Sequence, residues 1–148
     1  MDKKRGRYKF LDNLTSADVA FEAYGGDLNE LLENSAYALE NIMVDKLEKI
    51  RGERGEIIEV KAGDIEQLLY NFLHELIVLK DVKLLVFSRF NVNIRNRGGI
   101  YSLKCMCKGS KINPKVHEMI VDVKGISMHK LGVELKGGRY RAVVVVDV

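Results

Sequence analysis

The chain has 148 residues, the length of one ordinary domain with a sizeable hydrophobic core. Its 47% hydrophobic and 30% charged residues exclude disordered and fibrous proteins, and a net charge of +3, from 24 Lys and Arg against 21 Asp and Glu, does not identify a nucleic-acid-binding protein. No apolar run reaches the roughly 20 residues that span a bilayer, and the basic start lacks an apolar signal core, so we expect a soluble cytoplasmic protein without a membrane partner.

One proline and no Ser- or Pro-rich stretch predict a single domain over residues 1–148, in which residues 1–7 form a basic, frayed tail. Strands are expected at residues 8–11 and 18–24. A helix then begins with a capping box, because Asp27 can cap it and Glu30 follows three residues later. Its apolar residues recur at steps of three and four: Leu28, Leu31, Leu32, Ala36, Leu39, Ile42 and Met43.

A second helix is predicted by the same pattern after Gly63 and Asp64, and a short strand at residues 56–60 precedes it. Its apolar stripe is Ile65, Leu68, Leu69, Phe72, Leu73, Leu76 and Ile77. Further strands are expected at residues 83–94, 100–108, 119–123, 126–135 and 140–148, with glycine turns at 98–99 and 137–138. We therefore predict an α+β fold, a two-layer, largely antiparallel β-sheet packed by two α-helices, in which the last strand, with four consecutive valines, is central.

No catalytic residue is predicted from the motifs of this sequence. The three histidines, His74, His117 and His129, have no zinc or triad spacing, and no nucleophile elbow, phosphate loop or dinucleotide fingerprint is present. Cys105 and Cys107 are separated by one residue, which favours two reduced thiols that face the core. The pattern therefore indicates no enzyme.

Acidic residues at strand ends are candidates for a metal site. Asp12 closes the first predicted strand, Asp18 opens the second, and Asp147 follows the four valines. Carboxylates gathered at strand ends suit a hard cation, which takes six to eight oxygen ligands. From the residues alone, hydrated surface acids are the simpler interpretation and metal ligands the alternative.

Seven motifs, in order, resemble the archease family over residues 8–148. The family's D-H-T-A-D-V/I and A-Y/W-G motifs are similar to residues 12–19 and 23–25, and its D-L-x-E-L-x-E-N-A helix to residues 27–35. Its W-L-N-E-L-L/I and L-F-S-x-F motifs are similar to residues 72–77 and 86–90. Its V-K-A-V/I-T-Y-H is similar to residues 123–129, and its closing D-V/I/L to Asp147 and Val148.

The resemblance implies an accessory protein that activates the GTP-dependent tRNA-splicing RNA ligase, promoting its guanylylation and multiple turnover, with indirect or weak RNA contact. It also implies a divalent metal, usually given as calcium. By position, the ligands are Asp18, Asp147 and a backbone or terminal oxygen of Val148, with Asp12 as a further candidate. Lys124 matches a functionally required lysine of the family, although from the residues alone it is an ordinary exposed strand lysine.

Departures from the family pattern affect the first acidic motif most. Two extra residues separate Asp12 from Asp18, and Asn13 replaces the family histidine. Gly125, Ser127 and Met128 replace the usual Ala, Thr and Tyr. Two alternatives stay open: an RNA- or protein-binding, chaperone-like modulator, which predicts salt-sensitive RNA binding, and a small metal-dependent hydrolase, which predicts unaided turnover of a phosphoester.

Overall fold

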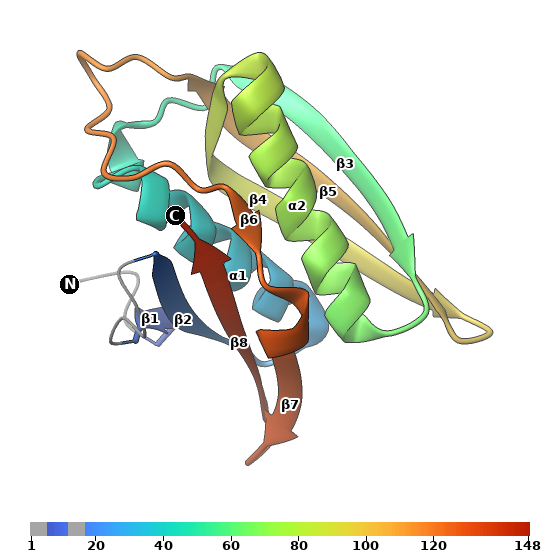
Figure 1. The fold of residues 1–148 in the computed structure, drawn as a ribbon. Helices are drawn as coiled ribbons and strands as arrows, with labels where there is room; N and C mark the ends of the chain where they lie inside the picture. Colours follow the sequence, from blue (N-terminus) through green and yellow to red (C-terminus); the bar gives the residue numbers. More distant parts are fainter. Residues whose placement is uncertain (1–5, 12–16) are drawn as a thin grey trace.

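Two antiparallel sheets enclose two helices in the computed structural model, which describes residues 6–11 and 17–148 (Figure 1). The helices are α1 (Leu28–Met43) and α2 (Ile65–Lys83), and two short 3-10 turns are η1 (Leu47–Lys49) and η2 (Met128–Lys130). Each helix contacts strands of both sheets, so the helices form the middle layer. None of the helices in the described chain is long and apolar enough to cross a membrane.

The larger sheet has five strands: β1 (Tyr8–Phe10), β2 (Asp18–Gly25), β6 (Gly125–Ile126), β7 (Gly132–Lys136) and β8 (Arg139–Asp147). Its order is β1-β2-β8-β6, and β7 also pairs with β8. The smaller sheet has the order β3-β5-β4, formed by β3 (Arg54–Ala62), β5 (Ile100–Lys111) and β4 (Leu85–Arg97). The prediction of a central last strand is confirmed, because β8 pairs with β2 on one side and with β6 and β7 on the other.

The α+β class, with two helices and antiparallel pairing, is confirmed. The strands form two sheets with the helices between them, and not the single sheet that the sequence predicts. Both predicted N-caps are present: Asp27 accepts from the N–H of Glu30, and Asp64 from the N–H of Gln67, each at 2.8 Å. Only at the start of α1 does a side chain of the first turn also bond back to the preceding backbone: the Glu30 carboxylate accepts a hydrogen bond from the Gly26 N–H.

The strand expected at residues 119–123 is wrong, and the long strand expected at 126–135 is divided into β6, η2 and β7. Residues 119–123 make only an isolated bridge, between Met119 and Val44, and the Val123 carbonyl instead accepts a hydrogen bond from the ammonium of Lys80 at 2.7 Å. The pattern of apolar residues predicts a strand at 119–123, but a strand also needs a neighbour to pair with, and no described strand lies alongside this segment.

Side chains of α1 cap the edge of β4. The N–H groups of Phe87, Val92 and Ile94 donate to Glu40, Glu33 and Asn29 at 3.0, 2.9 and 2.9 Å. These β4 donors face away from β5 and would otherwise lack strand partners. The helix therefore satisfies the open edge of the smaller sheet.

Glu40 is completely buried in this edge cap. Burial raises the pKa of its carboxyl group to about 8, although the Phe87 N–H and the positive charge of Lys80 oppose the shift. Its Oε1 accepts from Phe87, whereas its Oε2 has no hydrogen-bond partner among the described residues. A protonated Glu40 is the form that this apolar setting favours.

The two cysteines lie on β5 and face the core, as predicted. Both are free and fully buried, and their Sγ atoms are 3.5 Å apart. The contact with Cys105, together with burial, raises the pKa of the Cys107 thiol. The Cys107 thiol is therefore held in its protonated form, and burial shields both sulfur atoms from reagents in solution.

Candidate functional site

Three strands of the larger sheet end together and bring the predicted site residues into one place. Asp18 of β2 is the register partner of Asp147 of β8, and Asp147 also pairs with Gly125 of β6. Register partners project from the same face of a sheet, so the two carboxylates are neighbours. Asp147 is exposed and Asp18 is half-buried. This edge therefore presents two acids to solvent from segments distant in the sequence.

Backbone hydrogen bonds add Lys124 and Val148 to the same edge. The Lys124 N–H donates to the carbonyl of Asp147 at 2.8 Å, and the Val148 N–H donates to the carbonyl of Ala17 at 3.0 Å. Asp18, Asp147, Val148 and Lys124 are thus brought together. Asp12 and Asn13 lie outside the described residues, as does most of the insertion that follows them.

The oxygen atoms at this edge are of the chemical type that a hard divalent cation binds. Carboxylate and backbone oxygens are the ligands that calcium prefers, and calcium takes six to eight of them. Within residues 6–11 and 17–148, no three His, Cys, Asp or Glu side chains form a group that could hold a metal ion. A cation held by Asp18, Asp147 and Val148 would therefore need further ligands from water or another molecule.

Gly125 replaces the usual alanine without altering this edge. A Cβ atom built on Gly125 would lie 3.8 Å from Oδ2 of Asp147, an ordinary van der Waals contact. Alanine and glycine are therefore both compatible with the observed position of the Asp147 carboxylate.

Lys80 of α2 anchors the segment that leads to Lys124 and Gly125. Its side chain is 4% exposed, and its ammonium contacts the carboxylate of Asp122, the carbonyl of Val123 at 2.7 Å and the carboxylate of Asp81 at 2.9 Å. Burial lowers the pKa of Lys80, but hydrogen bonds to the two carboxylates outweigh it and the pKa is raised. Sequence analysis missed this lysine, although it continues the apolar stripe three residues after Ile77.

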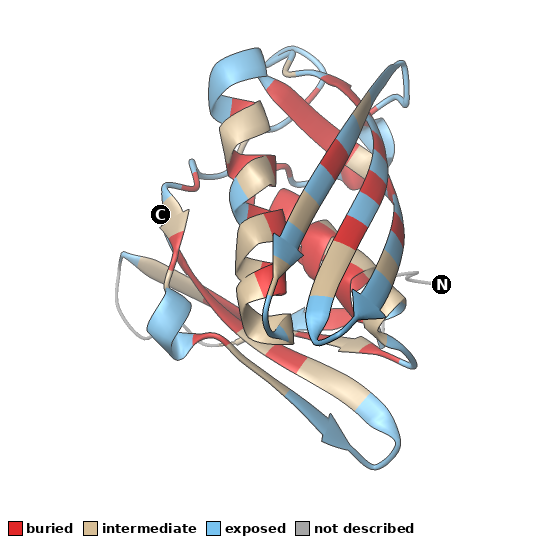
Figure 2. Ribbon diagram, turned by 90° about the vertical axis from the view of Figure 1, so that its right-hand side faces the viewer, coloured by how far each residue is buried: buried red, intermediate tan, exposed pale blue. Residues whose placement is uncertain are grey.

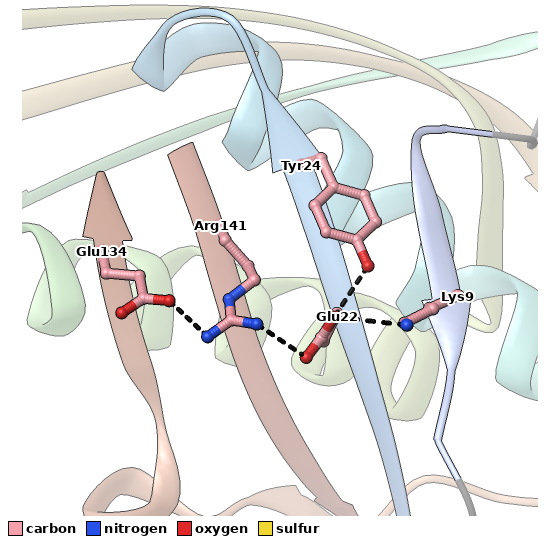
Figure 3. A network of polar contacts seen from close by, with 5 residues as sticks. All are labelled: Lys9, Glu22, Tyr24, Glu134 and Arg141. Carbon is pink, nitrogen blue, oxygen red and sulfur yellow. Dashed lines mark hydrogen bonds and ion pairs between the residues drawn. The ribbon is translucent and has the colours of Figure 1, made fainter. Parts of the chain in front are cut away.

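A second polar cluster lies on the same sheet face, further along the strands (Figure 3). The carboxylate of Glu22 accepts from the Tyr24 hydroxyl at 2.7 Å and from Arg141 at 3.3 Å, and its distance to the Lys9 ammonium is 3.8 Å. Arg141 also pairs with Glu134. Burial and Glu22 raise the pKa of Tyr24 to about 12. The charges of this cluster are paired with one another, which gives it a structural role.

The histidines occupy three separate environments. His117 is buried, and its Nδ1 accepts from the Asn113 N–H at 3.0 Å, which closes a local turn. His74 stacks on Tyr70 along α2, with ring centroids 5.9 Å apart. His129 is exposed in η2. These placements give each histidine a local setting of its own.

Comparisons with known proteins agree on one family. Residues 8–148 match the model of the Archease protein family (MTH1598/TM1083). The chain is 35% identical to Protein archease of Methanosarcina mazei, with 100% of both chains covered. It is 40% identical to Protein archease of Pyrococcus furiosus, covering 90% of this chain and 94% of that protein.

Solved structures agree with these relatives. Protein 1598 of Methanobacterium thermoautotrophicum superposes with a TM-score of 0.83 at 30% identity, over 95% of this chain and 98% of that one. An archease from Thermotoga maritima, described as a possible chaperone, shares the fold at a TM-score of 0.58 and 20% identity, over 90% and 93% of the two chains. The chain therefore belongs to the archease family.

Proposed function

We propose that this protein is an accessory protein that activates the GTP-dependent tRNA-splicing RNA ligase, promoting its guanylylation and multiple turnover. Membership of the archease family supports this function. The observation that carries it is the meeting of Asp18 and Asp147 with the Lys124 segment at one accessible sheet edge. Acidic and basic groups at such an edge are suited to contact a partner protein and its anionic substrate.

The residues of this edge have distinct roles in the proposed mechanism. Asp18, Asp147 and an oxygen of Val148 would hold a divalent cation, with calcium as the proposed ion. When bound, the cation supplies positive charge that attracts and orients an anionic group. Lys124 would contact a phosphate or a carboxylate of the ligase. Lys80 positions the Lys124 segment through Asp122 and Val123.

Activation follows if this edge binds one conformation of the ligase more tightly than the others. Attack on the triphosphate of GTP develops charge that must be stabilised by positioned groups. A protein that prefers the conformation with those groups in place shifts the ligase population toward it. The activator then needs no nucleophile or general base of its own.

The test is ligation by the cognate ligase with GTP and divalent metal, counted as turnovers per ligase. We expect multiple turnover with the wild-type protein, and single turnover or less with Asp147→Asn or Lys124→Ala. Glu48→Gln, which removes an exposed acid outside the site, is the matched control and should behave as wild type. Thermal unfolding verifies that each variant is folded. Failure of the folded wild-type protein to stimulate the ligase would reject the proposal and favour a chaperone-like modulator.

A further inference from the structure

The outward face of the smaller sheet is strongly basic. Exposed residues alternate with buried ones along β3, β5 and β4 (Figure 2). The basic face, as we call it, carries six exposed cations: Lys61, Arg89, Arg95, Arg97, Lys104 and Lys108. Glu59 is the one acid that the described strands add to this face. With six cations against one acid, this single surface carries more net positive charge than the +3 of the whole chain.

The register places these cations next to one another. Lys108 pairs with Arg89, and Ser102 lies between Lys61 and Arg95 in the next strands. Adjacent strands are about 4.8 Å apart, and like charges directly opposite each other are destabilising. None of the six cations forms a salt bridge with another described residue. Glu59, the register partner of Lys104, is the one acid beside them, so most of this repulsion is not compensated within the described sheet.

The outward face of the larger sheet differs in this respect. There Lys9 and Arg141 are paired with Glu22, and Arg141 is also paired with Glu134 (Figure 3). Lys9 and Arg141 of the larger sheet thus have acidic partners, whereas the six cations of the basic face have none among the described residues. An external polyanion would supply the missing negative charge.

A hollow of about 500 Å³ lies within the basic face. Its polar lining consists of the cations Lys61, Arg95 and Lys104, the neutral side chains Asn93 and Ser102, and one acid, Glu59. The three cations outnumber the single carboxylate, so the lining keeps a net positive charge. Ammonium, guanidinium, amide and hydroxyl groups all donate hydrogen bonds to phosphate oxygens. The hollow is therefore suited to a phosphate group.

We propose that the basic face binds nucleic acid through its sugar-phosphate backbone, without reading the bases. Side chains on the same face of a strand recur about every 6.7 Å, a repeat comparable to that of phosphates along an extended nucleic-acid strand. The exposed apolar residues on the face, Ile57, Ile100 and Met106, include no aromatic ring on which a base could stack. The proposal does not rest on ligase activation, because Asp18 and Asp147 lie on the other sheet.

The test is fluorescence anisotropy with a fluorescein-labelled oligouridine and an RNA duplex, between about 50 and 200 mM salt. We expect binding to both, with log K falling against log salt with a slope of about −2 to −4, which corresponds to roughly three to five phosphates. The double variant Lys104→Glu/Arg95→Glu should weaken binding at least about tenfold. Lys115→Glu/Lys136→Glu, with the same change of net charge outside the basic face, should weaken it less than about threefold.

Three results would overturn the proposal: no binding at the lower salt concentration, equal weakening by the two double variants, or displacement of the RNA by polyglutamate as readily as by unlabelled oligonucleotide. The last result would indicate an acidic protein partner. Circular dichroism establishes that the variants are folded. If charge reversal unfolds the sheet, the neutral pair Lys104→Met/Arg95→Gln replaces it, with the same criteria at a smaller loss of affinity.

Discussion

Asp18 of β2 and Asp147 of β8 are direct register partners, so two carboxylates project side by side from one face of the larger sheet. Two like charges in such a position repel each other, by roughly 0.2–1 kcal/mol in an exposed pair. A cation bound between the two carboxylates would replace their repulsion by attraction to the cation. If a cation binds here, we therefore expect the stability of the sheet to depend on the ions in solution.

Replacing Asp147 by asparagine tests that link without the ligase. In metal-free buffer, Asp147→Asn should be as stable as wild type or more stable by up to about 1 kcal/mol, because the repulsion is removed. Calcium should raise the unfolding temperature of the wild-type protein by binding the folded state, and should leave that of the variant unchanged. Differential scanning fluorimetry with and without calcium measures both effects. An equal rise in the two proteins would place the calcium elsewhere.

Lys80→Met should loosen the segment before Lys124. The substitution keeps the apolar stem but removes the ammonium, so Asp122 loses its partner and the Val123 carbonyl is left without its donor. We expect a loss of about 2 kcal/mol in the free energy of unfolding. Urea denaturation measures the loss, and hydrogen exchange should show faster exchange at residues 122–126.

Lys83→Met is the control for Lys80, since it removes an exposed lysine of α2 that pairs with Glu56. Lys83→Met should lower the free energy of unfolding by less than about 1 kcal/mol, the usual limit for an exposed ion pair. If Lys80→Met were equally mild and residues 122–126 exchanged no faster, Lys80 would not anchor the segment.

Glu40 should make the folded state less stable at alkaline pH. Its pKa is raised from 4.5 to about 8 in the fold, so between these values the folded protein holds a proton that the unfolded chain releases. Stability due to this group therefore falls as the pH rises through that window, by up to about 1.4 kcal/mol per pH unit. Burial raises the pKa of Glu33 as well, which adds a change of the same sign.

Glu40→Gln isolates the pH dependence due to Glu40, because glutamine does not titrate and its oxygen can still accept a hydrogen bond from the Phe87 N–H. The variant should be close to wild type near pH 5 and more stable than wild type near pH 8. Urea denaturation over this range provides the comparison. Parallel pH profiles for the two proteins would contradict a raised pKa at Glu40.

The thiols of Cys105 and Cys107 should resist modification in the folded protein. Both are buried, which keeps Ellman's reagent away from their sulfur atoms, and the raised pKa of Cys107 disfavours the thiolate that reacts rapidly. We expect reaction at the rate of unfolding in native buffer and two fast equivalents in guanidinium. Fast native labelling of either thiol would show that β5 opens locally.

The features predicted correctly from the sequence have local causes. Asp27 and Asp64 cap their helices through hydrogen bonds to residues three positions away, and the alternation of Cys105 and Cys107 is a property of one strand. The division into two sheets depends on which strands pair across the whole chain, which no single segment encodes. Residues 119–123 show the difference, since their strand-like pattern found no partner strand.

The candidate site was predictable only in part. Asp18 and Asp147 carried no coordination pattern in the sequence, and their adjacency follows from the register between β2 and β8. Family resemblance, and not spacing, supplied Lys124 and Val148. Glu40 and Lys80 were missed, although each is a charged residue on the apolar stripe of its helix. A charged residue on an apolar stripe must be buried with a partner, and this could have identified both residues from the sequence.

The contacts between α1 and the edge of β4 have a consequence for self-association. A strand edge with free donors can recruit a strand of another molecule and seed ordered aggregates. Asn29, Glu33 and Glu40 occupy those donors, so intermolecular sheet growth from β4 requires the helix to detach first. The protection of the β4 edge against strand addition is thus tied to the docking of a single helix.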